Sequence, residues 1–261
     1  MTIKIYVATH KPYSYPSDTN IYVPIEVGAA LREPHFCLVR DDIGNDNISL
    51  KNGNFCELSA IYWMLRNDNS THVGLVHYRR HFKLGARNEE KFIGRWGVNS
   101  CVTACELDKL FKCYDIVIPK RIKFHAHIEQ DYKINHVHAD YEITRSIIKD
   151  KYPKYLKYFD DFSCQRSIHT CNMFVMPQQL FRECWEWIFS VLFELELSID
   201  ISSYDSYQRR VFGFISERLF NVWILYAAQE LNLRIYESGV INLESKSRVK
   251  KLFSKFIKES I

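Results

Sequence analysis

Short runs of β-branched and aromatic residues alternate along this chain with longer segments of helical periodicity. This alternation favours a sheet flanked by helices, and the order of the segments is that of a nucleotide-binding α/β domain. Residues 21–31 are interrupted by Pro24 and Gly28, so we expect them to be extended and loop-like. The predicted strands cover residues 3–9, 72–76, 115–119, 170–176 and 233–243, and the predicted helices cover residues 55–66, 105–112, 140–150, 177–197 and 206–230.

The size of the chain fits one large domain. Its 261 residues are 47% hydrophobic, which is enough for a sizeable buried core. We place this domain at residues 1–245 and treat residues 246–261 as a tail. In the tail, basic residues lie among apolar residues at helical spacing, a pattern typical of a basic amphipathic helix. Such a helix either docks on the domain through its apolar face or contacts anionic lipids.

The sequence shows no signal for export. No charged-then-apolar leader precedes residue 3, and the longest apolar run, residues 219–228, is about half the length that crosses a bilayer. The eight cysteines form no CxxC pair, so we expect reduced, mostly buried thiols. The modest net charge of +4 gives no reason to expect a nucleic-acid partner. We therefore expect a cytoplasmic protein.

The densest polar cluster, residues 77–81, reads HYRRH and follows a predicted buried strand. Ligands of open α/β sheets bind beyond the carboxyl ends of strands, where this cluster should lie. The adjacent Arg79 and Arg80 suit a diphosphate, because a guanidinium donates paired charge-assisted hydrogen bonds. The alternative is that both are surface arginines held in ion pairs.

Six segments give a more specific signal: IKIYVATHK, DNIS, NGNFCELSAIYWMLRN, HVGLVHYRRHF, TCNMFVM and RRVFGFISERLFNVW. In order and spacing they resemble a family of bacterial capsule, exopolysaccharide and O-antigen glycosyltransferases long catalogued only as a domain of unknown function. The resemblance covers nearly the whole chain. Members of that family with an assigned activity look like galactosyl- or galactofuranosyltransferases that use UDP-linked donors.

The resemblance implies a GT-A-like (Rossmann-like) nucleotide-sugar-binding domain of the α/β class, with additional C-terminal helices. It also implies a UDP-sugar donor that carries galactofuranose or galactose, and a lipid-linked oligosaccharide or polysaccharide as acceptor. Near such an acceptor, the basic tail could hold the enzyme peripherally on the inner face of the cytoplasmic membrane.

The chain departs from the usual GT-A pattern at one position. Most transferases of that class carry an Asp-x-Asp that holds a divalent metal on the diphosphate, whereas this sequence reads His77-Tyr78-Arg79 there. Arginines can neutralise a leaving UDP without a metal. We therefore predict metal independence and no cofactor besides the donor substrate.

Several polar residues would belong to the donor site under this resemblance. Thr9 and His10 end the first predicted strand, and together with Asn47 they would lie near the uridine. Asn54 and Glu57 open a predicted helix whose amino end favours contacts to phosphate or ribose. From the residues alone, Asn54 is equally well explained as a helix cap and Thr9 as a turn residue.

The predicted acid and sugar contacts lie in the second half of the chain. Asn172 resembles the sugar-contacting Asn that many nucleotide-sugar transferases place on a strand, or it is a turn residue at a strand start. Glu217 is our first candidate for the base of an inverting reaction, and Asp140 is the second. Glu217 could instead form a structural salt bridge with Arg218 or Arg210.

Three alternatives stay open at the level of the sequence. The His-rich residues 125–138 contain two His-x-His pairs, His125 with His127 and His136 with His138, which can ligate zinc. The His and Arg clusters could serve a metal-dependent phosphoryl or phosphodiester transfer. The chain could also be a non-catalytic carbohydrate-binding module of a polysaccharide assembly complex.

Overall fold

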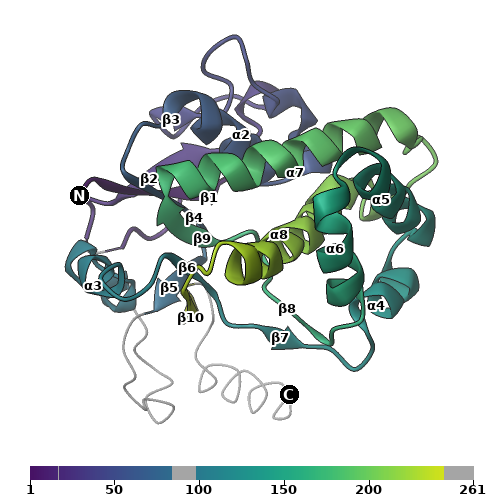
Figure 1. Cartoon of the computed structure of the whole chain (residues 1–261). Coiled ribbons are helices and arrows are strands. Elements are labelled where there is room, and N and C mark those ends of the chain that lie inside the picture. The colour runs from purple at the N-terminus through teal and green to yellow at the C-terminus, as the bar shows by residue number, and fades with distance from the viewer. Residues whose placement is uncertain (17, 84–97, 244–261) are drawn as a thin grey trace, which may run out of the picture.

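A computed structural model describes residues 1–16, 18–83 and 98–243, and the predicted basic tail lies outside this part of the chain. The described residues form a mixed eight-stranded sheet, a small two-stranded sheet and a layer of helices (Figure 1). The eight strands are β1 (Ile3–Thr9), β2 (Tyr22–Glu26), β3 (Val39–Arg40), β4 (His72–His77), β5 (Arg80–Lys83), β6 (Ile116–Pro119), β9 (Phe174–Pro177) and β10 (Ile235–Asn242).

The sheet has a parallel half and a mixed half. Strands β3, β2, β1 and β4 follow one another in space and are all parallel, so their carboxyl ends share one edge. Strand β9 runs antiparallel to both β4 and β6, while β10 pairs parallel with β6 and antiparallel with β5. The two-stranded sheet joins β7 (Ile122–Lys123) to β8 (Ser167–Ile168).

Side chains alternate between two hydrophobic cores, one on each face of the large sheet. In β1, Tyr6 and Ala8 belong to one core, while Ile5 and Val7 belong to the other. Strand β9 divides in the same way, because successive side chains of a strand point to opposite faces. Burial on both faces explains why these strands read as nearly continuous apolar runs.

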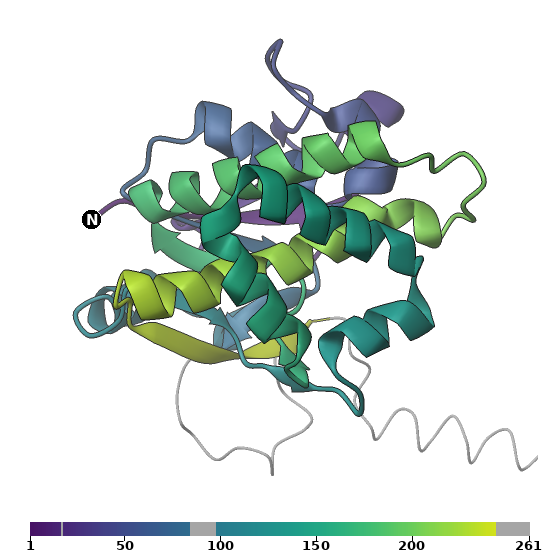
Figure 2. The same ribbon diagram turned by 45° about the vertical axis from the view of Figure 1, so that its right-hand side comes forward.

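The helices gather mainly on one face of the sheet, where α7 and α8 cross it side by side (Figures 1 and 2). Residues 208–230, which include α8, are long and apolar enough to span a membrane, but 72% of the apolar window is buried inside the protein. This helix is therefore part of the core. The α-helices are α1 (Asn52–Phe55), α2 (Leu58–Asn67), α3 (Ala104–Leu110), α4 (Ile128–Asn135), α5 (His138–Lys151), α6 (Leu156–Ser163), α7 (Gln178–Ser198) and α8 (Val211–Glu230).

The α/β class predicted from the sequence is confirmed, and three local predictions are corrected. Residues 22–26 form strand β2 despite Pro24, because β3 pairs only with Ile25 and Glu26 and leaves the proline without a partner on that side. The helix expected to start near Asn54 is broken at Cys56, whose φ is +53°. The strand expected over residues 170–176 begins only at Phe174.

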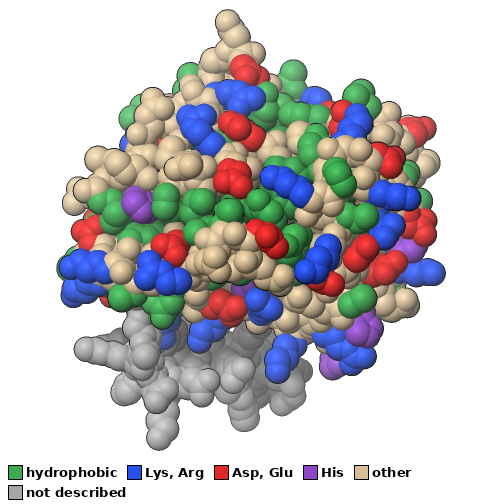
Figure 3. Space-filling model, viewed as in Figure 1, with side chains coloured by type: hydrophobic (Ala, Val, Ile, Leu, Met, Phe, Trp, Pro, Cys, Tyr) green, Lys and Arg blue, Asp and Glu red, His purple; other side chains and the backbone are tan. Residues whose placement is uncertain are grey.

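Basic and acidic side chains are interspersed over the face drawn in Figure 3, in keeping with the modest net charge of +4.

All eight cysteines are free, as expected. Contrary to expectation they are not mostly buried, since only Cys101 and Cys184 are fully enclosed.

Candidate active site

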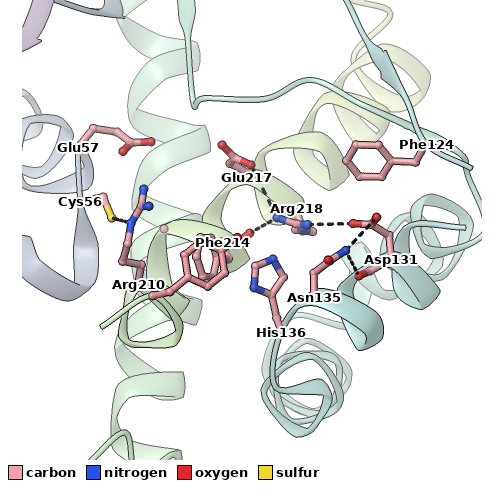
Figure 4. A pocket seen from close by; sticks show the side chains of 12 residues that line it. Cys56, Glu57, Phe124, Asp131, Asn135, His136, Arg210, Phe214, Glu217 and Arg218 are labelled. Atoms are coloured by element: carbon pink, nitrogen blue, oxygen red, sulfur yellow. Dashed lines mark hydrogen bonds and ion pairs between the residues drawn. The ribbon is translucent and has the colours of Figure 1, made fainter. Parts of the chain in front are cut away.

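Two cavities adjoin one another, and one of them lies beside the carboxyl ends of the parallel strands. They share Cys56, Glu57, Arg210 and Glu217, and we call the two cavities together the cleft. The arginine cavity, of about 390 Å³, is lined by Ala8, His10, Val27, Arg32, Asn52, Gly53, His77, Tyr78, Arg79, Arg80 and Cys171 together with the shared residues. The aromatic cavity, of about 330 Å³ and drawn in Figure 4, is lined by Phe124, Asp131, Asn135, His136, Tyr207, Gly213, Phe214 and Arg218 together with the shared residues.

The arginine cavity lies where an α/β sheet is expected to bind ligands. His10 follows β1, Val27 follows β2, and His77 ends β4. Tyr78 and Arg79 form the two-residue turn of a hairpin in which His77 pairs with Arg80 at the start of β5. The hairpin thus places both arginines in the lining of the arginine cavity, at the edge where the parallel strands end.

Positive charge dominates the arginine cavity. It is lined by the guanidinium groups of Arg32, Arg79, Arg80 and Arg210, against two carboxylates, Glu57 and Glu217. Within the described residues, neither Arg79 nor Arg80 forms an ion pair, so the alternative of paired surface arginines does not hold there. Unpaired guanidiniums in a half-buried cleft suit an anion with several oxygen atoms, such as a diphosphate.

Glu217 lies at the junction of the two cavities, on α8, with a side chain that is 23% exposed. Its Oε1 accepts a hydrogen bond of 2.7 Å from the backbone N–H of Cys171, and its Oε2 lies 3.7 Å from Arg218 Nη1. Burial raises the pKa of this carboxyl, although Arg218 opposes that shift by favouring the charged form. A carboxylate with a raised pKa that faces a cavity is well suited to accept a proton.

A left-handed turn before β9 fixes several of these groups. Cys171 and Asn172 have φ values of +74° and +47°, which non-glycine residues rarely adopt. The carbonyl oxygen of Cys171 lies 2.7 Å from Nε2 of His77, which places the imidazole proton of a neutral His77 on Nε2. The Asn172 amide donates to Glu57 Oε1 at 2.9 Å. One turn therefore positions Glu217, His77 and Glu57.

The break at Cys56 brings Glu57 into the cleft. Asn52 Nδ2 donates to the Cys56 carbonyl oxygen at 2.6 Å and replaces a helical partner where the helix is interrupted. Asn52 packs against Gly28, where an added Cβ would lie 2.7 Å from Asn52 Oδ1. The Cys56 thiol accepts a 3.3 Å hydrogen bond from Arg210 Nε, and burial raises its pKa to about 11.

The structure brings most of the predicted site residues together in the cleft. His10, Glu57, His77, Arg79, Arg80 and Glu217 line the arginine cavity, and Arg218 lines the aromatic cavity. Arg218 is 5% exposed and lies between Glu217 and Asp131, at 3.7 and 3.9 Å, so the predicted pairing with Glu217 is present.

Three predicted donor-site residues do not line the described cavities. Thr9 is fully buried, and its hydroxyl bonds the Lys11 carbonyl oxygen in a turn. The Asn47 amide donates to the Gly44 carbonyl oxygen at 2.7 Å and so closes its own loop. Asn54 lies within α1, which begins two residues earlier than the predicted helix.

Asn172 and Asp140 are also set back from the cavities. Asn172 is 1% exposed and lies in the left-handed turn rather than on the strand, so it contacts Glu57 instead of facing the cleft. Asp140 is buried in α5 and accepts a hydrogen bond of 2.8 Å from the Tyr204 hydroxyl. Burial raises the pKa of Asp140, but the group lines neither cavity.

The His-rich segment does not assemble a metal site. In the part of the chain that the structure describes, no three His, Cys, Asp or Glu side chains converge in a way that could hold a metal ion. His136 packs against Phe214, with ring centroids 4.1 Å apart, while His127 Nδ1 bonds the Cys164 carbonyl oxygen at 2.5 Å.

Some cleft residues were missed from the sequence. Arg32 follows a segment expected to be a loop, and nothing local marks it as a ligand-binding residue. Arg210 was considered only as a partner for Glu217, although its place one residue before α8 put it near the same cleft. Asp131 and Asn135 lie on α4, a helix that was not predicted.

A mixed β-sheet covered by helices, with a polar cleft beyond its parallel strands, defines a protein of the ligand-binding α/β class. The chain belongs to the family described as a domain of unknown function (DUF4422), whose model matches residues 4–229. Among solved structures, the chain is similar to one titled "WbbM bifunctional glycosytransferase apo structure", with 29% sequence identity and a TM-score of 0.83. The match covers 94% of this chain and 46% of that one, so this chain spans about half the length of that protein. No curated protein matches the chain.

Proposed function

We propose that this chain is a glycosyltransferase of the GT-A-like class that transfers a sugar from a UDP-sugar donor. Its likeness to a bifunctional glycosyltransferase over 94% of its length supports this reading. The observation that carries it furthest is the pair Arg79 and Arg80, which are without ion-pair partners among the described residues and line the same cavity as the half-buried Glu217. Inverting transfer from a UDP-sugar is favoured by groups that stabilise the leaving diphosphate and by a base that takes the acceptor proton.

In this proposal the donor diphosphate lies along the arginine cavity. Arg79 and Arg80 donate to the phosphate oxygens, and such charge-assisted hydrogen bonds contribute about 1.5–3 kcal/mol each. Arg32 and Arg210 line the same cavity and add positive charge. Because negative charge builds on the β-phosphate as the sugar departs, these guanidiniums would stabilise the transition state more than the bound donor. This donor site would work without a divalent metal.

Glu217 serves as the base. Its carboxylate takes the proton from an acceptor hydroxyl while that oxygen attacks the anomeric carbon of the donor. The bond between that carbon and the diphosphate oxygen breaks, and its electron pair leaves with UDP. The products are UDP and a glycoside with inverted configuration, and the proton remains on Glu217 until it passes to solvent.

The proposal also names the transferred sugar and the acceptor. We infer galactose, in furanose or pyranose form, as the transferred sugar, and a lipid-linked oligosaccharide or polysaccharide of the capsule or O-antigen type as the acceptor. An enzyme that acts on such an acceptor would work in the cytoplasm or peripherally on the inner membrane face. These assignments are supported by the resemblance of its motifs, HYRR among them, to polysaccharide glycosyltransferases.

UDP release from UDP-galactopyranose and UDP-galactofuranose, with methyl β-D-galactopyranoside or water as the acceptor of the sugar, tests the proposal. Wild type should release UDP from one of them, and Glu217→Gln should release it at least about a hundredfold more slowly, because the amide still accepts the Cys171 hydrogen bond but takes no proton. The exposed Glu186→Gln on α7 is the matched control. Release of inorganic phosphate or UMP that requires a divalent metal would point instead to phosphoryl transfer, and binding without turnover would point to a non-catalytic carbohydrate-binding module.

A further inference from the structure

We propose that the aromatic cavity is the binding site for an uncharged sugar unit of the acceptor. This inference rests on the proposed function, because it assigns the second substrate of the same cleft. The two cavities share Glu217, Glu57, Cys56 and Arg210, so a molecule in the aromatic cavity has direct access to the Glu217 carboxylate. Figure 4 shows Glu217 and Glu57 on the side of the cavity away from Asn135.

Four aromatic side chains line the cavity. His136 and Phe214 have ring centroids 4.1 Å apart, and Tyr207 lies 5.0 Å from Phe214 and 5.8 Å from His136. Phe124 lines the cavity from the segment between β7 and α4. The electron-rich face of a ring attracts weakly positive C–H groups, which one face of a pyranose or furanose supplies.

Three hydrogen-bonding side chains also line the cavity. Asp131 and Asn135 lie one helical turn apart on α4, and the Asn135 amide donates to Asp131 Oδ1 at 3.2 Å. Arg218 Nε is buried without a hydrogen-bond partner among the described residues. A carboxylate, an amide and a guanidinium can together bind several hydroxyl groups of a sugar ring, because each hydroxyl can both donate and accept a hydrogen bond.

The balance of charge in the aromatic cavity differs from that in the arginine cavity. Arg218 lies between two carboxylates, Asp131 and Glu217, at 3.9 and 3.7 Å. Burial and the nearby Arg218 lower the pKa of His136 to about 4, so this imidazole is neutral near pH 7. The compensated charge favours a neutral ligand over a phosphate or an acidic sugar, whereas the arginine cavity favours an anion.

Saturation-transfer NMR with methyl β-D-galactopyranoside and methyl β-D-galactofuranoside tests this site. We expect ring-proton signals from at least one glycoside, and these should persist when saturating UDP fills the arginine cavity. Tyr207→Ala should weaken glycoside binding about tenfold, equivalent to about 1.4 kcal/mol. Tyr207→Phe should restore it, because the ring is retained. Tyr207 is 49% exposed, so its truncation should leave the fold intact, and Tyr15→Ala, at 52% exposure, is the matched control.

Three outcomes would overturn the inference: no signal from either glycoside, displacement of the glycoside by UDP, or equal binding to wild type and Tyr207→Ala. UDP affinity, measured separately by calorimetry, distinguishes this failure from failure of the proposed function. If UDP binds and the glycosides do not, only the acceptor site is wrong. If the glycosides bind and UDP does not, the proposed transferase activity is wrong and the sugar site stands.

Discussion

Glu217 accepts a 2.7 Å hydrogen bond from the backbone N–H of Cys171, in a turn whose backbone is left-handed at two successive residues. The carbonyl oxygen of the same Cys171 bonds His77, which ends strand β4 beside the two arginines. A single peptide segment thus links the proposed base to the proposed diphosphate site. The geometry of the cleft therefore depends on this turn, in which Cys171 lines the arginine cavity and Asn172 lines neither cavity.

The pH dependence of transfer should follow the ionisation of Glu217. Burial raises its pKa above the ordinary 4.5, so activity should fall as the pH drops through this raised value. Arg218 favours the charged form, so Arg218→Gln should move the acid limb of kcat/KM to higher pH. The measurement is a pH profile of UDP release for both proteins. If the acid limb of the variant lies at the same pH as that of the wild type, Arg218 does not influence the ionisation of Glu217.

The Asn172 side chain should matter more than its exposure suggests. Asn172→Ala removes the hydrogen bond to Glu57. It also places alanine, which adopts left-handed backbone less readily than asparagine, at a φ of +47°. We expect a loss of about 1–3 kcal/mol in the free energy of unfolding, and lower activity. Asn172→Gly relieves the backbone but still lacks the amide. If this amide positions Glu57, the glycine variant should recover its free energy of unfolding in denaturation experiments, while its activity stays low.

Gly28 should resist substitution. Its φ is +63°, and a Cβ there would lie 2.7 Å from Asn52 Oδ1, displacing the side chain that bonds the Cys56 carbonyl oxygen. Gly28→Ala should lower the free energy of unfolding by about 1–2 kcal/mol and reduce activity through the shifted Glu57. Gly239→Ala, whose nearest contact is Lys83 Cβ at 4.0 Å, is the control. Equal melting temperatures for the two variants would argue against this role.

Stability should decline in mild acid through His81. This histidine is fully buried with neither ring nitrogen hydrogen-bonded among the described residues, and burial lowers its pKa from 6.5 to about 4. Between these values the unfolded chain binds a proton that the folded chain does not, so stability is complete above pH 6.5 and is lost as the pH falls toward 4. The loss reaches about 3 kcal/mol for this group.

His81→Phe should flatten that acid dependence, since a phenyl ring can retain the packing against Tyr13 and Tyr22 and does not titrate. Denaturation midpoints measured across this pH range provide the test, with the exposed His125→Gln as control. An unchanged slope in His81→Phe would assign the acid sensitivity to other groups, of which His136, with a pKa also near 4, is the first.

The sequence was most informative where a short motif follows a buried strand. The HYRRH cluster predicted a ligand site, and His77, Arg79 and Arg80 line the cleft. His81 does not, because residues 80–83 form a strand and alternate side chains point to opposite faces. The hairpin was not predicted, because its turn residues, Tyr78 and Arg79, are not those typical of two-residue turns.

Other errors came from contacts between distant segments. The break at Cys56 depends on Asn52 and Gly28, and the turn at Asn172 depends on Glu57 and Ser216, so no local pattern revealed either. The aromatic cavity was missed because its wall includes α4, where Ile128 and Tyr132 alone are buried and the apolar periodicity is weak. Tertiary packing decides such segments, and local propensity does not.

UDP binding measured by calorimetry, with and without EDTA, tests the central claim most directly, on wild type and on the double variant Arg79→Ala/Arg80→Ala. The account predicts micromolar binding by the wild type that survives EDTA and is lost in the double variant, because the two guanidiniums bind the diphosphate. Absence of UDP binding, binding that requires a divalent metal, or equal binding by the double variant would contradict an arginine-held donor site.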